Sequence, residues 1–353
     1  MRFALSTEQL DFAGELRKIL DAGQVPAAVR AWAEGDAAKG RALLRQVADM
    51  GVFGLIVDEK YDGADATLVD LVVALIELGR GAAPGPVIES AAVIPALLQR
   101  LPDSAPAQRW LSALAGGDAL ATISFAPQRG IALDADIAEP VLVAADGRLT
   151  LGRLLGAAEG STDAVPAPTA AEVVTSIDPA RRLFRVTGDE LIGEGREVEA
   201  AIEYAFDIGV VACAAQLLGA GRSILEQTTG YAKQRKQFGR AIGEFQAVKQ
   251  QLADVRIALD LAEPLLYRAA LTVESDDRAR DVSAAMVACG DAAHRAARAG
   301  LQVHGAIGYT AEFDLSLWLT KVAALRTAWG TADFHRGRIA AALRAAEPAL
   351  APS

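Results

Sequence analysis

The chain has 353 residues, of which 52% are hydrophobic, so it is long enough for two or three structural units and too apolar for global disorder. Its formal net charge of −10 argues against nucleic acid or an anionic membrane as the main partner. The longest nearly uncharged apolar run, residues 208–221, is shorter than the roughly 20 residues of a membrane span, and the first residues lack a secretory signal. We therefore expect a cytoplasmic protein.

The first third of the chain is patterned as helix. Ser6 and Gln9 have the spacing of a capping box, and apolar residues follow them at helical intervals. A polar loop over 58–66 separates two helical stretches, and a Pro-Gly-Pro sequence ends the second before helix resumes over 87–101. We predict an N-terminal helical domain over residues 1–118.

The sequence pattern changes near residue 118. Short apolar runs bounded by turn residues predict strands at 120–124, 141–143, 173–175 and 183–186. Asp146-Gly147 stands where a tight hairpin turn is expected. We predict a small central β domain over residues 119–196.

The remainder is again helical. Four alanine-rich stretches with apolar stripes cover residues 201–234, 244–274, 279–302 and 313–346. Such stripes typically pack as an antiparallel bundle, which predicts a C-terminal four-helix bundle over residues 197–353 and an α+β, mostly helical fold. We expect this bundle to form the subunit interface, with the small residues of 209–221 and 284–300 allowing close helix approach between chains. The only cysteines, Cys213 and Cys289, are expected to be buried thiols.

A basic turn lies between the first two of these helical stretches. Lys233, Arg235, Lys236 and Arg240 place four cations within eight residues of an acidic protein. The planar fork of an Arg suits a diphosphate, and the neighbouring Phe238 offers a flat face to a purine. The alternative is a solvated cluster of cations at a helix end, where they complement the helix dipole.

Two stretches carry a resemblance to a known family. Residues 231–246 resemble the acyl-CoA dehydrogenase signature Arg-x-x-Phe-Gly followed by Phe-Gln. Residues 302–310, in the family's order and spacing, are similar to its Gln-x-x-Gly-Gly-x-Gly-Tyr-Thr segment, and residues 58–63 are close to its Pro-Glu-x-x-Gly-Gly loop. The resemblance covers nearly the whole chain and implies the same helix–sheet–helix layout.

The resemblance implies a flavoprotein that desaturates an acyl-CoA, with a Glu base removing the α proton and FAD receiving the β hydride. In this family two neighbouring subunits share each FAD. One subunit binds the flavin ring and supplies the base, and the other contacts the diphosphate and adenosine. By this resemblance the second set of contacts falls on Arg235, Gln237, Phe238, Gln246, Gln302 and Gly305.

The residues for the base are missing. The position that holds Glu after the Gln-x-x-Gly-Gly segment in many members is Trp329, and the alternative position on the preceding helix falls at Gly209 or Val210. An indole cannot accept a proton in this chemistry. The segments that contact the flavin ring also depart from the family pattern, at residues 124–132 and 154–159.

Selective loss of this kind predicts division of labour in a hetero-oligomer. The chain most resembles the base-lacking subunit of the actinobacterial α2β2 acyl-CoA dehydrogenases, several of which act on CoA thioesters of steroid side chains. A homologous sister subunit would carry the Glu and bind most of the acyl-CoA, and an electron-transferring flavoprotein is a candidate acceptor.

Two alternatives remain open. One is a self-sufficient flavoenzyme with an unorthodox base, for which Asp333, Glu312 and Asp314 are candidates. The other is a scaffold subunit that binds no cofactor. No metal site is expected, because the three histidines lack metal-ligand spacing.

Overall fold

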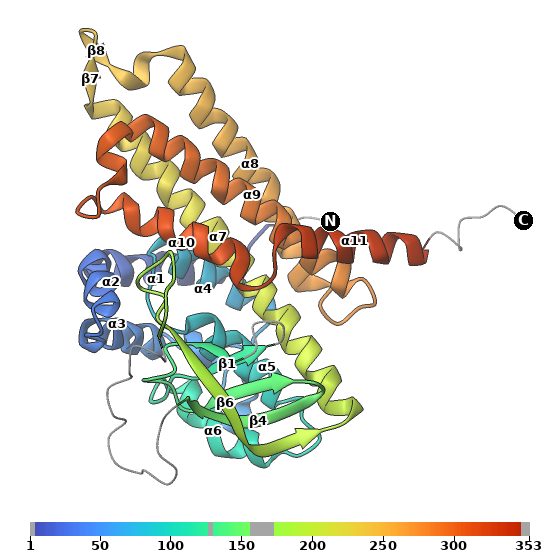
Figure 1. The fold of residues 1–353 in the computed structure, drawn as a ribbon. Helices are drawn as coiled ribbons and strands as arrows, with labels where there is room; N and C mark the ends of the chain where they lie inside the picture. The colour runs from blue at the N-terminus through green and yellow to red at the C-terminus, as the bar shows by residue number, and fades with distance from the viewer. Residues whose placement is uncertain (1–3, 126–129, 156–172, 347–353) are drawn as a thin grey trace, which may run out of the picture. The chain divides into compact units, whose positions relative to one another are not determined.

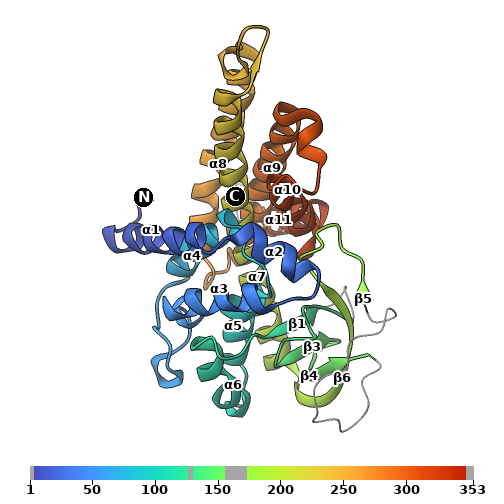
Figure 2. The same cartoon turned by 90° about the vertical axis from the view of Figure 1, so that its left-hand side faces the viewer.

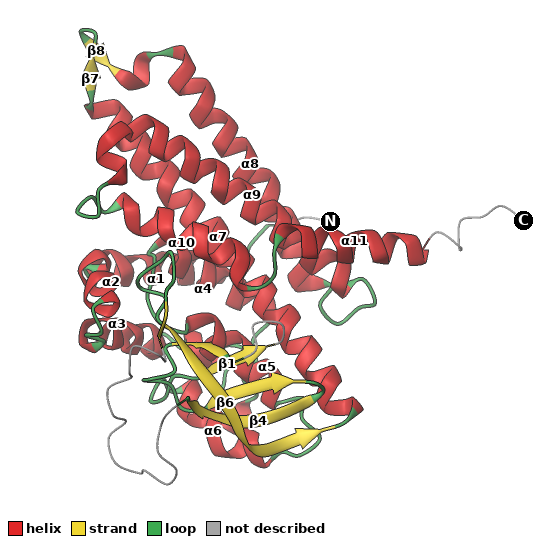
Figure 3. Ribbon diagram, viewed as in Figure 1, coloured by secondary structure: helices red, strands yellow, loops and turns green. Residues whose placement is uncertain are grey.

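The computed structural model describes residues 4–125, 130–155 and 173–346, and the chain forms two compact units (Figures 1 and 3). The helical unit comprises Met1–Asp21, Val72–Ala82 and Val210–Ser353. The sheet unit comprises Ala22–Leu71 and Ala83–Gly209. The predicted α+β, mostly helical fold is confirmed, whereas the division into three domains at residues 118 and 196 stays a prediction.

The N-terminal third is helical as predicted. Its helices are α1 (Thr7–Ala22), α2 (Val25–Ala33), α3 (Ala38–Asp49), α4 (Leu68–Arg80), α5 (Ile94–Leu98) and α6 (Ala105–Ala115). The predicted capping box at the start of α1 is confirmed: the Ser6 hydroxyl accepts the amide N–H of Gln9 at 3.2 Å, and the Gln9 side chain accepts the amide N–H of Ser6 at 3.0 Å.

The sheet unit contains one mixed sheet with the strand order β1-β3-β4-β6-β2, and β5 also pairs with β6. Its strands are β1 (Thr122–Phe125), β2 (Ile131–Leu133), β3 (Val141–Ala145), β4 (Arg148–Leu154), β5 (Val173–Val174) and β6 (Leu183–Glu194). β1 and β3 are parallel and the other pairs are antiparallel. The predicted hairpin turn is present between β3 and β4, with φ of 53° at Asp146 and 71° at Gly147, as a type I′ turn requires.

A buried carboxyl group joins α2 to the loop after β2. The indole N–H of Trp32 donates to Oδ1 of Asp134 at 2.9 Å, and both residues are fully buried. The other oxygen, Oδ2, accepts no hydrogen bond from any described residue. Burial raises the pKa of Asp134 to about 7, although the Trp32 hydrogen bond and the charge of Arg182 lower it.

The helical unit is built around α9 (Arg278–His304). The unit also contains α8 (Gln246–Leu271), α10 (Leu315–Ala328), α11 (Ala332–Ala346) and the part of α7 (Arg196–Gln234) that begins at Val210. α9 lies beside α8 in two perpendicular views and also packs against α10 and α11 (Figures 1 and 2). The prediction of one continuous helical stretch over 313–346 was wrong, because the chain breaks at Gly330, whose φ of +100° is incompatible with a right-handed helix.

Small residues bring helices together within the chain. A Cβ at Gly219 of α7 would lie 1.8 Å from the carbonyl oxygen of Ile76 in α4, and one at Gly221 would lie 3.2 Å from Cα of Ala293 in α9. Most of the small side chains of 209–221 and 284–300 are buried in this packing. The expectation that they allow close approach between chains was therefore wrong: the interior of this chain uses them.

Both cysteines lie in this interior, as predicted. Cys213 and Cys289 are completely buried and neither forms a disulfide. Burial raises the pKa of Cys289 to about 12, which makes it an unreactive thiol at neutral pH.

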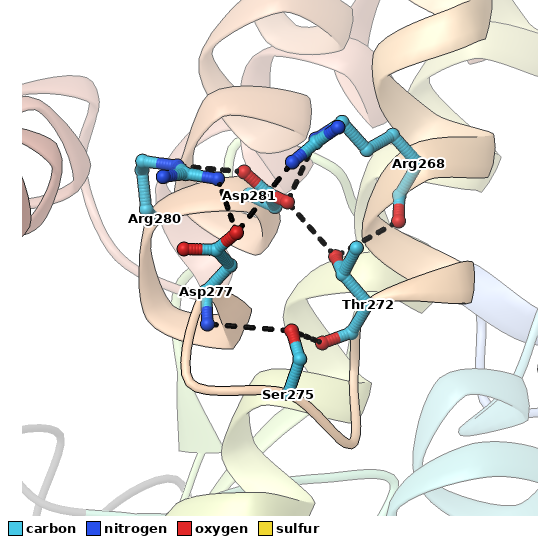
Figure 4. A network of polar contacts seen from close by, with 6 residues as sticks. All are labelled: Arg268, Thr272, Ser275, Asp277, Arg280 and Asp281. Carbon is cyan, nitrogen blue, oxygen red and sulfur yellow. Dashed lines mark hydrogen bonds and ion pairs between the residues drawn. The ribbon is translucent and has the colours of Figure 1, made fainter.

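A polar network closes the turn between α8 and α9 (Figure 4). The carboxylate of Asp281 accepts hydrogen bonds from Arg268 at 2.8 Å, Thr272 at 3.0 Å and Arg280 at 2.9 Å. Burial raises the pKa of Asp281, but these hydrogen bonds and the two arginine charges outweigh it, so its pKa is lowered overall. The network ties the end of α8 to the first turn of α9.

α7 is long and apolar enough to cross a membrane by length and composition alone. In its most apolar 18-residue window, however, 89% is buried inside the fold. This is the pattern of a core helix.

Candidate functional site

The basic turn forms a short β-hairpin at the end of α7. β7 (Lys236–Gln237) and β8 (Arg240–Ala241) pair antiparallel, and Phe238 and Gly239 form the turn between them. Both turn residues have positive φ, 53° and 79°, which costs little at Gly239 but strains Phe238. Phe238 is 91% exposed, and the ring of Phe245 meets it edge-on at a centroid distance of 6.2 Å, so most of the strained residue lies open to solvent. We call residues 233–241 the basic hairpin.

The cations of the basic hairpin carry no counter-charge in the described part of the chain. Lys233, Arg235, Lys236 and Arg240 are all exposed, and none forms an ion pair with a described residue. Arg240 instead lies 4.2 Å over the ring of Phe245, in a cation–π contact. This concentration of positive charge on an acidic protein suits an anionic ligand.

The second predicted segment begins in the last turn of α9. Gln302 is exposed and Gly305 ends the helix with φ of 64° and ψ of −142°, a conformation that is essentially restricted to glycine. A Cβ built on Gly305 or on Gly239 would meet no atom within 4 Å. Open space therefore adjoins both backbones, where a ligand could approach closely.

Aromatic contacts bring the two segments together. The ring of Tyr231, one helical turn before Arg235, stacks on the ring of His304 with centroids 4.2 Å apart. His304 lies between Gln302 and Gly305, so the C-terminal ends of α7 and α9 meet at one end of the bundle (Figure 1). Gln246 begins α8, after the short helix Ile242–Glu244 that follows the hairpin, and is also exposed.

Five of the six predicted cofactor residues thus lie on two joined segments, and the sixth starts the helix that follows the hairpin. The sequence-based prediction missed the contact that joins them. Tyr231 and His304 stand inside the two motif stretches, but nothing in the spacing of the motifs indicates that their rings stack.

The two positions expected to hold the base are buried and cannot accept a proton. Trp329 is 5% exposed and ends α10, and its carbonyl oxygen accepts a hydrogen bond from Nε2 of His335 at 2.9 Å. Gly209 and Val210 are buried within α7. No carboxylate substitutes for the family Glu at any of these positions.

The alternative carboxylates are placed as ordinary surface groups. Asp333, Glu312 and Asp314 are all exposed, and Asp333 lies 3.4 Å from Arg336 in an ion pair. No group of three or more His, Cys, Asp or Glu able to hold a metal occurs among the described residues.

The loop at 58–63 has a structural explanation. The amide of Asp58 donates to the Gln99 side chain at 2.8 Å, and a Cβ at Gly63 would lie 1.9 Å from the carbonyl oxygen of Val57. The two segments predicted to have lost flavin-ring contacts fall partly outside the described residues, which omit 126–129 and 156–172.

Family models match most of the chain. Residues 6–118 match the model described as acyl-CoA dehydrogenase, N-terminal domain, and residues 199–344 match acyl-CoA dehydrogenase, C-terminal domain. The chain is 31% identical over 297 residues to acyl-CoA dehydrogenase IpdE2 of Mycobacterium tuberculosis, covering 84% of this chain and 85% of the relative.

Solved structures share the fold. The ChsE4–ChsE5 complex of Mycobacterium tuberculosis matches with a TM-score of 0.81 at 24% identity, over 98% of this chain and 99% of the matched chain. A structure described as the Tcur3481–Tcur3483 steroid ACAD matches with a TM-score of 0.79 at 21% identity, over 97% and 99%. The chain belongs to the acyl-CoA dehydrogenase family.

Proposed function

We propose that this chain is the non-catalytic subunit of a heteromeric, FAD-dependent acyl-CoA dehydrogenase. It completes the FAD site of a homologous sister subunit that carries the Glu base, in an α2β2 assembly. The observation that carries the proposal is a contrast: the basic hairpin keeps four unpaired cations among the described residues, while Trp329 and Gly209 occupy both base positions.

The residues present fit the diphosphate and adenosine end of FAD. Arg235 would bind the diphosphate through charge-assisted hydrogen bonds, and Gln237, Gln246 and Gln302 offer amide groups to the same cofactor. Phe238 would lie against the adenine, which would cover an exposed ring held in a strained conformation. When bound, FAD supplies a hydride acceptor for the β carbon of the acyl-CoA.

The candidate bases of this chain are not shielded from solvent, which argues against catalysis by this chain alone. A general base for the α proton works best in a site from which water is excluded, where its pKa is raised toward neutrality. Asp333, Glu312 and Asp314 are exposed instead. Exposure supports the interpretation that they are solvated or helix-capping carboxylates and not the catalytic base.

The partner is proposed to cover an apolar stripe on α8. Ile257, Leu261 and Leu265 recur every four residues along the outer face of this helix and are 56%, 68% and 39% exposed. In the monomer this apolar stripe is exposed to water, so burying it against a sister subunit would stabilise the complex. The heteromeric ChsE4–ChsE5 complex, which shares the fold, is a precedent for such an assembly.

The acyl-CoA is proposed to be a CoA thioester of a steroid side chain, bound mainly by the sister subunit. The proposed substrate class rests on the fold-level likeness to a structure described as a steroid ACAD and on the family resemblance. An electron-transferring flavoprotein is the proposed electron acceptor.

Purification tests the proposal. The chain expressed alone is expected to hold little FAD and to leave acyl-CoA unoxidised, whereas the tagged chain isolated from its native host is expected to bring down a flavin-containing homologue. Stoichiometric FAD together with acyl-CoA oxidation by the chain alone would refute it. A complex that assembles but shows no flavin absorbance would favour the cofactor-free scaffold.

A further inference from the structure

His304 is a buried aromatic group in the middle of an otherwise exposed segment. Gln302 and Gly305 on either side of it are exposed, yet the His304 side chain is only 5% accessible. Its ring stacks on Tyr231 of α7 at a centroid distance of 4.2 Å and an interplanar angle of 26°. On its other side Phe313, in the segment before α10, lies 5.2 Å away.

One hydrogen bond fixes the orientation of this ring. Nδ1 lies 2.8 Å from the carbonyl oxygen of Gly300, and because a carbonyl only accepts, Nδ1 carries the proton and donates it. Burial lowers the pKa of His304, although the Gly300 hydrogen bond opposes this, so the ring is neutral at pH 7. The side chains that face it, Tyr231 and Phe313, are aromatic.

The same contacts fix where α9 lies along α7. A Cβ at Gly300 would be 2.8 Å from Ile224 and 3.1 Å from Thr228, so only a glycine lets the two helices approach this closely. Tyr231 in turn holds the start of the basic hairpin, since its carbonyl oxygen accepts the amide N–H of Arg235 at 2.8 Å. A shift of the Tyr231–His304 stack would therefore move Arg235 and Gln302 relative to each other.

We infer that His304 is a positioning residue for the cofactor site: by stacking on Tyr231 it sets the separation of the Arg235 and Gln302 side chains, so that both reach one FAD molecule. The inference rests on the proposed function. It assigns His304 no contact with the cofactor itself, because the ring is covered by Tyr231 and Phe313. Residues that bind a ligand need supporting contacts of this kind, because small displacements of their side chains weaken ligand binding.

Two substitutions separate stacking from general stability. His304→Ala removes the stack and the Nδ1 donor, whereas His304→Phe keeps an aromatic ring against Tyr231. In the tagged complex stripped of flavin, His304→Ala is expected to raise the FAD dissociation constant about tenfold, and His304→Phe to restore it to within about threefold of the unmodified complex.

His335 is the matched control. It is also buried, with Nε2 bonded to the Trp329 carbonyl at 2.9 Å and Nδ1 to the Ser283 hydroxyl at 3.2 Å, but it lies on α11, outside both motif segments. His335→Ala is expected to lower the melting temperature of the flavin-free complex and leave the FAD dissociation constant unchanged.

FAD titration monitored by flavin fluorescence, with the melting temperature of each flavin-free complex, decides the matter. If His304→Ala lowers only the melting temperature, as the control does, the positioning role is refuted. If His304→Ala leaves FAD binding intact while Arg235→Ala weakens it, the cofactor site stands and the inference alone fails. If neither affects FAD binding, the proposed cofactor site itself is wrong.

Discussion

Individual side chains of the basic hairpin are held at the surface without a neutralising partner in the described chain. Arginines in a protein of net charge −10 have many carboxylates available, and Arg17, Arg80, Arg222 and Arg268 all pair with one. Arg235 does not. Its charge is free for an anion from outside the described chain, and we propose that this anion is the diphosphate of FAD.

Arg235→Ala is expected to weaken FAD binding in the assembled complex by about tenfold or more, because charge-assisted hydrogen bonds to phosphate are lost. Fluorescence titration of the flavin-free complex measures this. Arg344→Ala, at an exposed position on α11, serves as the control and is expected to leave FAD affinity unchanged. Equal affinities for both variants would contradict the assignment of Arg235.

The buried Asp134 predicts a second residue-scale effect. Burial raises its pKa to about 7, above the value of about 3.9 for an unfolded Asp, so the folded state holds the proton more tightly. The stability that this contributes is fully present below about pH 4 and is lost as the pH rises through about 7.

Asp134→Asn keeps an acceptor for Trp32 and a residue that tolerates the φ of 50°, but it cannot ionise. Between pH 5 and pH 8 the unmodified protein is expected to lose about 2 kcal/mol of unfolding free energy relative to this variant. Urea unfolding at the two pH values measures the difference. Parallel pH profiles for Asp134→Asn and the unmodified protein would show that Asp134 is ionised in the fold.

At the scale of secondary-structure elements, helices α4 and α7 cross so closely within the helical unit that their backbones are in contact. A Cβ at Gly79 would lie 2.2 Å from the carbonyl oxygen of Gln216, and one at Gly219 only 1.8 Å from that of Ile76. No side-chain rearrangement relieves contacts with backbone atoms. Both glycines are therefore required for the two helices to approach.

Gly219→Ala is expected to lower the unfolding free energy by about 2–4 kcal/mol, because the helices must separate. Gly230→Ala is the control in the same helix, since a Cβ there meets nothing within 4 Å. It should be neutral or stabilise by up to about 1 kcal/mol through helix propensity. Thermal unfolding of the two variants compares them, and equal melting temperatures would contradict the close crossing.

The long helices were predictable because their apolar periodicity extends over many turns, as in 201–234 and 279–302. The break at Gly330 was not, since it depends on a single positive φ within a helical composition. The second half of β6 was also missed. Gly188, Asp189 and Glu190 have little strand propensity, and their pairing with β4 is a tertiary effect.

The candidate site likewise has features that the sequence predicts and features that it does not. The six proposed cofactor residues could be named from the sequence because their motifs lie in two short contiguous stretches, and their role stays a prediction. The Tyr231–His304 stack was not, because it joins positions distant in sequence and depends on helix packing. Likewise, composition indicated close helix approach for the small residues of 209–221, but it could not tell that their partners lie in the same chain.

For the molecule as a whole, the exposed stripe of Ile257, Leu261 and Leu265 on α8 is the surface that we propose for the sister subunit. Leu261→Lys should release the partner while leaving the folding of this chain nearly unchanged, because the side chain is already 68% exposed. Size-exclusion chromatography of the co-purified proteins measures the loss. Leu10→Lys, on α1 and 58% exposed, is the control. Retention of the partner by Leu261→Lys would place the interface elsewhere.

Native mass spectrometry of the tagged chain isolated from its own host tests the division of labour most directly. The expected species contains two copies of this chain, two copies of a homologue with a Glu at the position equivalent to Trp329 or Gly209, and bound FAD. A species containing only this chain, with FAD bound and acyl-CoA oxidised, would contradict it.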